Sequence, residues 1–433
     1  MIIGFDAKRI VRNTTGLGNY CRTLVNDLTR VVPSDWQLRL YAPDSGRDDL
    51  RSKVVEAPNL SFVYPGNADA ATDQKAQRSL LTTIPVIGPL YRSFWRIGPI
   101  VGDLQRHGVQ LYHGLTGELP RGLRQAGIPA VVTIHDLIFM RHPEYYHWID
   151  RQIYEWKFRV ACREATRIIA ISECTKRDII ALGGVDADRI DVIYQSCSPR
   201  FAAPAASERS APLPSVSAPA PRPSAPAPPP SAPASPPSAP APPPGVGCAA
   251  ALPLPRRFIL SVGTIEARKN IALAVKALPL LPADVHLVAV GRRTKYSDRV
   301  LAAARQQGLA DRVHFLHGVS DADLQTIYQQ AEAFVYPSRY EGFGIPIIEA
   351  IFSGLPVVAA TGSCLEEAGG PDSLYVSPDD PAALAAAVAA VLKGAPGREQ
   401  RMAAARRYVA RFEGNNVATQ VLNVYQRVMS DAK

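Results

Sequence analysis

The sequence lacks the cysteine spacing of a disulfide framework or a metal site. Its six cysteines include no C-x-x-C pair, which favours a reducing compartment and small apolar side chains over bridges. The most apolar window, residues 80–102, holds three prolines and two arginines, which excludes a membrane-spanning helix. The apolar stretch at the N-terminus is interrupted by Asp6, Lys8 and Arg9, so it is too short for a secretory signal. We therefore expect a cytoplasmic protein without a metal site.

The sequence also lacks a concentrated block of charge. The net charge of +9 is spread along the chain, whereas nucleic-acid binders usually gather Lys and Arg on one face or arm. A diffuse excess of positive charge fits an anionic small molecule or an acidic membrane surface. We expect no nucleic-acid partner.

Proline is ordinary except in one segment. Of the 39 prolines, 19 fall in residues 201–255, which otherwise contain mostly Ala and Ser. Such a segment has too little apolar surface to offset the entropy of ordering, so we predict a disordered linker with polyproline II character. Composition favours an expanded surface loop over an SH3-type ligand. Deleting it should leave activity largely intact.

Short apolar strands alternate with amphipathic helical segments on both sides of this insert. We predict strands at residues 1–5, 38–41, 109–112, 130–134, 167–171 and 190–194, and again at 258–262, 286–290, 313–316, 333–336, 356–359 and 374–376. This alternation is typical of parallel sheets covered by helices. The fold class is therefore α/β, with two facing, Rossmann-like, doubly wound domains and ligands expected in the cleft at the strand ends.

These patterns also predict the domain organisation. The N-terminal, acceptor-binding domain spans residues 1–200, the linker 201–255 and the C-terminal, donor-binding domain 256–410. A last helical stretch within residues 411–433 follows a complete second domain and is in a position to return to the first.

Residues 75–107 contain five basic residues, among them Arg92 and Arg96, and one acidic residue. Apolar side chains are interleaved with these charges. Such a mixture suits the interface of an anionic bilayer or the mouth of a site for a lipid-linked sugar. A helical hairpin packed on the first domain explains it equally well. Peripheral contact with the inner membrane is therefore one of two open interpretations.

The most informative segment is residues 338–350, SRYEGFGIPIIEA. Gly342 and Gly344 let the backbone approach a ligand, and Pro346 suits the start of a helix after the strand at 333–336. Free N–H groups and the helix dipole at such a turn would stabilise a phosphate. Because Glu341 and Glu349 would repel that phosphate, they are better explained as acceptors for sugar hydroxyls, one at a hexose and one at a ribose.

Glu341 and Glu349, with seven residues between them in the setting YEGFGIPIIEA, resemble the E-x7-E motif of retaining glycosyltransferases of family 4, which have the GT-B fold. Similarity continues at residues 262–270 (VGTIEARKN) and 354–358 (GLPVV), and in the N-terminal half at 16–20 (GLGNY) and 135–137 (HDL). It covers both domains and excludes the insert. Residues 6–9 and 263–270 further resemble bacterial mannosyltransferases of O-antigen or exopolysaccharide assembly.

The resemblance assigns roles to particular residues. Arg268 and Lys269 match the basic pair that grips the donor diphosphate, assisted by the turn Gly342, Phe343, Gly344 and Ile345, with Glu349 at the ribose and Glu341 at the hexose. Thr264 stands where many members have a second arginine, so part of the expected charge clamp is either missing or supplied by Arg292 or Arg293. Fixed cations and a helix N-terminus can stabilise a departing diphosphate without a bound metal, so no cofactor is expected.

Five further candidates lie in the N-terminal half. Gly16 and Gly18 should form a turn between the first strand and its helix, facing the donor phosphates. His135 ends a strand and is a catalytic candidate at the reacting sugar, followed by Asp136 on the acceptor side. His113 has a similar but weaker claim, whereas His314 and His317 are expected to be structural.

The sequence thus predicts a retaining transferase that moves a hexose, best mannose from GDP-mannose, to a saccharide or polyprenyl-linked saccharide in surface polysaccharide biosynthesis. A GT-B nucleotide-sugar epimerase would share the donor site but need no acceptor. A scaffold without catalytic activity would use the proline-rich segment to bind a partner domain. The presence of both Glu341 and Glu349 argues against such a scaffold. The incomplete glycine pattern disfavours a Rossmann dehydrogenase.

Overall fold

The computed structural model describes residues 1–65, 94–198, 201 and 254–431. The described residues within 1–203 and 257–433 form one compact unit that contains two separate parallel sheets. The predicted linker lies almost entirely outside the described residues.

The first sheet has seven parallel strands in the order β3-β2-β1-β4-β5-β6-β7. Its strands are β1 (Ile2–Asp6), β2 (Gln37–Tyr41), β3 (Leu60–Val63), β4 (Leu111–Gly114), β5 (Ala130–Ile134), β6 (Arg167–Ala170) and β7 (Ile190–Val192). Its helices are α1 (Lys8–Arg12), α2 (Gly16–Val31), α3 (Asp48–Arg51), α6 (Ile100–Arg106), α7 (Ile138–Arg141), α8 (Trp148–Glu164) and α9 (Glu173–Gly183). The order reverses at β1, so that β2 and β4 flank it, which is the strand arrangement of a doubly wound sheet.

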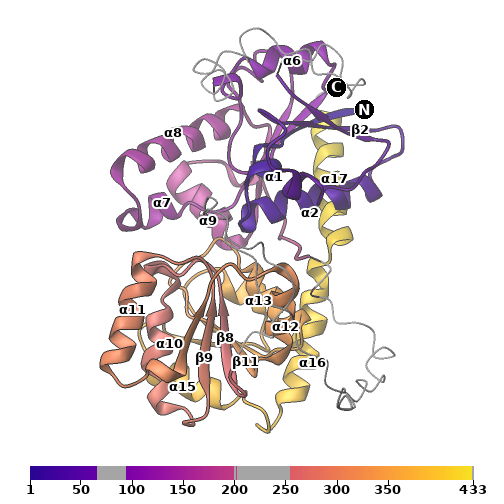
Figure 1. The fold of residues 1–433 in the computed structure, drawn as a ribbon. Helices are drawn as coiled ribbons and strands as arrows, with labels where there is room; N and C mark the ends of the chain where they lie inside the picture. The colour runs from indigo at the N-terminus through magenta and orange to yellow at the C-terminus, as the bar shows by residue number, and fades with distance from the viewer. Residues whose placement is uncertain (66–93, 199–200, 202–253, 432–433) are drawn as a thin grey trace, which may run out of the picture. The chain divides into compact units, whose positions relative to one another are not determined.

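The second sheet has six parallel strands in the order β10-β9-β8-β11-β12-β13. Its strands are β8 (Phe258–Val262), β9 (His286–Val290), β10 (Val313–Leu316), β11 (Ala333–Tyr336), β12 (Val357–Ala360) and β13 (Leu374–Val376). Its helices are α10 (Ile271–Ala277), α11 (Lys295–Gln306), α12 (Asp321–Gln330), α13 (Ile345–Phe352), α14 (Leu365–Gly369), α15 (Pro381–Ala389) and α16 (Arg398–Val409). Figure 1 shows α10, α11 and α15 on one side of β8 and β9, with α12 and α13 on the other.

The C-terminal helix α17 (Gly414–Asp431) packs into the core of the first sheet (Figure 1). Its buried side chains Val417, Val421 and Tyr425 join a cluster that contains Ile3 and Leu24. These apolar residues recur at intervals of three to four, which places them on one face of the helix. The last helix of the chain therefore completes the first hydrophobic core.

The expected α/β class with two doubly wound sheets is confirmed, and twelve of the strands lie within two residues of their predicted positions. The sequence analysis missed β3, an edge strand with the sequence LSFV that is only half buried. Its alternation is too short to stand out from a loop. Because β3 pairs with β2 alone, it extends the sheet without changing the strand order.

Candidate functional site

Two cations and one carboxylate meet where β8 and β11 end. Arg268 and Lys269 belong to the short 3-10 helix η5 (Ala267–Lys269) after β8, and Glu341 follows β11. Since β8 and β11 are parallel neighbours, their carboxyl ends bring these segments together at one edge of the sheet. Arg268 Nη1 lies 2.8 Å from Glu341 Oε2, and Lys269 Nζ lies 2.5 Å from Glu341 Oε1. The carboxylate therefore bridges both cations.

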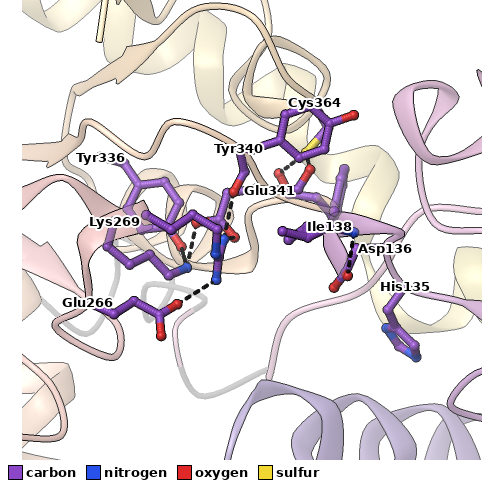
Figure 2. A network of polar contacts seen from close by, with 12 residues as sticks. His135, Asp136, Ile138, Glu266, Lys269, Tyr336, Tyr340, Glu341 and Cys364 are labelled. Carbon is purple, nitrogen blue, oxygen red and sulfur yellow. Dashed lines mark hydrogen bonds and ion pairs between the residues drawn. The ribbon is translucent and has the colours of Figure 1, made fainter. Parts of the chain in front are cut away.

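The surrounding side chains fix the charge state of this cluster. Burial alone would raise the pKa of Glu341, but the charges of Lys269 and Arg268 hold it at about 2. Burial alone would lower the pKa of Lys269, but the charge of Glu341 outweighs it and raises that pKa. Lys269 Nζ also donates to Tyr336 Oη at 2.7 Å, and Arg268 pairs with Glu266 at 2.8 Å. All three central groups are therefore ionised at neutral pH. Figure 2 draws the contacts of Lys269 and Glu341 as dashed lines.

The glycine after Glu341 makes a close backbone approach. A Cβ on Gly342 would lie 2.0 Å from the carbonyl oxygen of His135, which no side chain tolerates. The Gly342 carbonyl accepts hydrogen bonds from Ser172 Oγ at 2.7 Å and Thr175 Oγ1 at 3.2 Å. We expected the missing side chain of Gly342 to let a ligand approach the backbone. In this structure, it lets the backbone of His135, directly after β5, approach instead.

Neighbouring contacts hold the same loop in place. Tyr340 Oη donates to Asp178 Oδ2 at 2.6 Å, and its carbonyl accepts from Arg268 Nη1 at 2.6 Å. Cys364 Sγ donates to the carbonyl of Phe343 at 2.8 Å. The loop that carries Glu341 is thus bonded on several sides, so the carboxylate has a fixed position.

Helix α13 begins directly after this loop, as the sequence predicts. Gly344 precedes it with φ of 133°, a backbone conformation that favours glycine, and Ile345 and Pro346 open the helix. Glu349 accepts a hydrogen bond from the buried Tyr328 Oη at 3.0 Å. Phe343 is buried and stacks on Tyr194 with ring centroids 5.3 Å apart. Phe343 therefore anchors the turn by packing.

His135 and Asp136 follow β5 and lie across from the cation cluster (Figure 2). His135 Nε2 donates to the Leu115 carbonyl at 2.9 Å, so Nδ1 is the acceptor for Gln195 Nε2 at 2.8 Å. Burial lowers the pKa of His135 to about 4, so the ring is neutral at pH 7. Both ring nitrogens are occupied, so His135 would have to lose its Gln195 bond before it could act as a base.

Burial raises the pKa of Asp136, while the charges of Arg268 and Lys269 oppose that rise. Its Oδ1 accepts from the Ile138 N–H at 3.2 Å. A cavity of about 220 Å³ adjoins His135 and Asp136 and is also lined by Arg9 and Tyr146. This space lies within electrostatic reach of the cation cluster.

His113 is not at the site. It is fully buried, with Nδ1 2.6 Å from Tyr425 Oη on α17 and Nε2 2.9 Å from Thr133 Oγ1 on β5. This placement corrects the expectation of an acceptor-side role, because both ring nitrogens are used inside the core. Sequence position alone could not reveal it, since the tyrosine partner lies 312 residues away.

The N-terminal glycines also lie elsewhere than expected. Gly16 is the first residue of α2 and Gly18 lies in its first turn, so neither forms the loop after β1, which instead leads into α1. A Cβ on Gly18 would lie 2.0 Å from the Asn13 carbonyl, and the Gly18 N–H donates to Asn13 Oδ1 at 3.2 Å. Position 18 therefore requires glycine because its backbone lies close to the carbonyl of Asn13.

The extra charge expected beside Thr264 is not supplied by Arg293. Thr264 is half buried and its side chain makes no hydrogen bond with the described residues. Arg293 pairs at 2.9 Å with exposed Asp298 rather than with the cluster. Among the described residues, no three His, Cys, Asp or Glu side chains are grouped to hold a metal ion. Independence from metals stays a prediction.

One of the two arginines named in the segment 75–107 does not face outward. Arg96 has a side chain only 12% exposed and pairs with Asp6 and Glu118, so it faces inward. Arg92 lies outside the described residues. In the described part of the chain, no helix has the length and apolar character needed to cross a bilayer. A cytoplasmic location and peripheral contact remain predictions of the sequence.

Sequence reasoning missed the residues that hold the loop rather than carry charge. Tyr336, Ser172 and Tyr340 contact Lys269, Gly342 and Asp178 respectively, and polar side chains of these types occur throughout the chain. One signal was available for Tyr336, since it is the last residue of a predicted strand whose end carries the motif.

Two family models cover most of the chain. Residues 14–199 match Glycosyltransferase Family 4, and residues 249–408 match Glycosyl transferases group 1. The O-antigen chain mannosyltransferase B of Escherichia coli is 30% identical, with 98% of this chain and all of that protein covered.

Solved structures show the same fold. Sucrose-phosphate synthase from Thermosynechococcus elongatus superposes with a TM-score of 0.68 at 20% identity over the whole of both chains. Anabaena HepE in complex with UDP and glucose superposes with a TM-score of 0.63 at 17% identity, covering 98% of this chain and 99% of that one. Together with the sheets and the full-length relative, these matches show that the chain is a glycosyltransferase of family 4 with the GT-B fold.

Proposed function

We propose that this glycosyltransferase moves a mannosyl group, with retention of configuration, from GDP-mannose to a saccharide or polyprenyl-linked saccharide of a bacterial surface polysaccharide. The observation that carries the proposal is the bridged cluster of Arg268, Lys269 and Glu341, with Lys269 Nζ 2.5 Å from the carboxylate. The full-length similarity to an O-antigen mannosyltransferase supports the choice of sugar.

The cluster has the chemistry that a departing nucleoside diphosphate needs. Negative charge grows on the diphosphate as the bond to the sugar breaks, and two preorganised cations beside a helix N-terminus stabilise it. Arg268 and Lys269 would supply these charges, with the first turn of α13 after Gly344 completing the site. Both cations are already held in position by Glu341, Tyr336 and Glu266.

The two carboxylates, Glu341 and Glu349, would accept hydrogen bonds from sugar hydroxyls. Glu341 is ionised and bridges the cations, and its remaining lone pairs would accept from hydroxyls of the hexose. Glu349, held by Tyr328, would accept from the ribose. His135, neutral and bonded through both nitrogens, would form part of the wall beside the reacting sugar.

The decisive experiment has two steps. Thermal shifts with GDP-, UDP- and dTDP-sugars identify the donor, because a ligand that binds only the native state raises the melting temperature. Transfer from the donor found to a mannose-terminated oligosaccharide is then followed by NMR, which reads the anomeric configuration of the product. A melting temperature unchanged by every nucleotide sugar would contradict the donor site, and an inverted product would contradict retention.

The same experiment tests the epimerase alternative. An epimerase consumes the nucleotide sugar without an acceptor and returns a different nucleotide sugar, whereas a transferase releases the nucleotide only as the acceptor is glycosylated. The family matches and the full-length relative are glycosyltransferases, which favours transfer.

A further inference from the structure

A second cavity, of about 250 Å³, lies beside the end of β1. Asp6, the last residue of that strand, and Lys8, the first residue of α1, both line the cavity. Arg96, Glu118 and Trp156 also line it. It shares Glu118 and Lys157 with the cavity that adjoins His135 and Asp136. The two cavities are therefore neighbours with a common charged wall.

Four of the charged groups in this wall neutralise one another. Arg96 pairs with Asp6 and, at 3.1 Å, with Glu118. Lys157 Nζ lies 2.9 Å from the other oxygen of Glu118. Two carboxylates therefore balance two cations, and the paired side chains hold each other in position.

Two cations are left over in the same cavity. The side chains of Lys8 and Arg121 make no hydrogen bond or ion pair with any of the described residues. Burial lowers the pKa of Lys8, and the neighbouring positive charge of Arg96 lowers it further, while the charges of Glu118 and Asp6 oppose this only in part. A half-buried ammonium group lies beside a guanidinium, and Asp6 and Glu118, the carboxylates among the described lining residues, are already paired. This leaves a local excess of positive charge. An anion from outside the chain would relieve this excess.

One wall of this cavity is apolar. Trp156 of α8 has an exposed fraction of 44%, and Ile97 has one of 39%. Binding sites for small molecules commonly combine such aromatic and aliphatic walls with a few fixed polar groups. The indole can lie against the apolar face of a sugar ring, while the carboxylates accept from its hydroxyls.

We propose that this cavity binds an anionic group, phosphate or carboxylate, carried by the saccharide acceptor, with Lys8 as its principal cation. The inference rests on the proposed function and names the acceptor class for it. The reacting sugar would occupy the adjoining cavity beside His135 and Asp136, which lies within reach of Arg268. The shared wall of Glu118 and Lys157 would then separate the reacting sugar from the anionic group.

Binding of three small probes tests the proposal without turnover. The probes are methyl α-mannoside, α-mannose 1-phosphate and methyl glucuronide, titrated into the full chain without nucleotide and followed by ligand-observed NMR. We expect at least one anionic probe to bind about tenfold more tightly than the neutral one, equivalent to about 1.4 kcal/mol. Which of the two does so identifies the anion as phosphate or carboxylate.

Variants place that preference in the cavity. Lys8→Gln should remove it and Lys8→Arg should retain it, while Lys276→Gln, a change at an exposed lysine on α10, should leave it unchanged. Melting temperatures show that each variant is folded. Equal binding of neutral and anionic probes by the wild type would overturn the proposal. So would a preference that survives Lys8→Gln but disappears in Lys269→Gln, because the anion would then occupy the donor site.

The outcome is independent of donor identity. The probe titrations contain no nucleotide, so they remain informative even if GDP-mannose is not the donor. In turnover with an anionic acceptor, Lys8→Gln should raise the acceptor KM about tenfold and leave the donor KM unchanged. A fall in kcat with an unchanged acceptor KM would contradict the proposal.

Discussion

Glu341 holds Lys269 at 2.5 Å and Arg268 at 2.8 Å, so one carboxylate serves as counter-ion to both cations of the candidate donor site. A buried cation that loses its partner is costly, and this arrangement keeps two of them in position before any diphosphate arrives. The same carboxylate must therefore be considered in both donor binding and turnover.

Replacing Glu341 with Gln should separate these two roles. The variant keeps the shape of the side chain but loses the charge that meets the hexose hydroxyls, so kcat should fall by roughly 10- to 150-fold, or about 1.5–3 kcal/mol. The affinity for GDP should stay equal or rise, because both cations lose their internal counter-ion. Calorimetry with GDP and initial-rate assays measure the two quantities.

Glu366→Gln, at an exposed position on α14, is the matched control for that variant and should behave as wild type. If Glu341→Gln weakened GDP binding as much as it slowed turnover, the carboxylate would act by positioning the cations alone.

Replacing Lys269 with Gln should weaken donor binding. The variant removes one of the two charges expected to meet the diphosphate, so the Kd for GDP should rise about tenfold or more. Its dependence on salt should also become less steep, since fewer charges are involved. Lys276→Gln on α10 provides the comparison. An unchanged Kd would show that the diphosphate binds elsewhere.

Replacing Gly342 with Ala should disturb both stability and turnover. The added Cβ would lie 2.0 Å from the His135 carbonyl, so the loop carrying Glu341 must move away from the end of β5. We expect a lower melting temperature and a loss of turnover larger than the loss of GDP affinity. Gly102→Ala on α6 meets nothing within 4 Å and should stabilise the chain by about 0.5–1 kcal/mol. A Gly342→Ala variant with wild-type melting and kcat would refute the close approach.

His113 should make stability depend on pH. Burial lowers the pKa of His113 to about 3, well below that of an exposed histidine, so the unfolded chain binds more protons as the pH falls below about 6.5. The free energy of unfolding should therefore fall with pH, and this residue alone should contribute about 2 kcal/mol of loss at pH 5.

Chemical denaturation at pH 7 and pH 5 tests this expectation. His113→Gln should show a smaller pH-dependent loss than the wild type, although it starts less stable. His147→Gln, at an exposed histidine before α8, should keep the wild-type dependence. Identical slopes for wild type and His113→Gln would show that His113 is not the titrating group.

The elements of the fold could be predicted because they depend on local patterns. Apolar runs such as residues 258–262 and 333–336 predict buried parallel strands, and the glycine and proline before residue 347 predict the start of α13. The edge strand β3 escaped detection because only one of its four residues is buried. Strand pairing needed only the usual rules for doubly wound sheets.

The candidate site could be predicted only in part. Arg268, Lys269 and Glu341 fall together because strand ends of neighbouring parallel strands meet, which follows from the order of the sheet. The contact of Gly342 with His135 and the burial of His113 against Tyr425 join segments more than 200 residues apart. No local pattern records such pairs, so glycine at a close approach and histidine in a core resembled ligand-binding residues.

Helix α17 places a late part of the chain inside an early core, where Val417 and Tyr425 pack with Ile3. During synthesis on the ribosome, the strands of the first sheet emerge long before the residues that cover their exposed apolar side. The second domain can therefore be fully synthesised while the first domain still lacks its last helix. Truncation within α17 should consequently damage the half of the enzyme that is made first, leaving an exposed apolar surface that promotes aggregation.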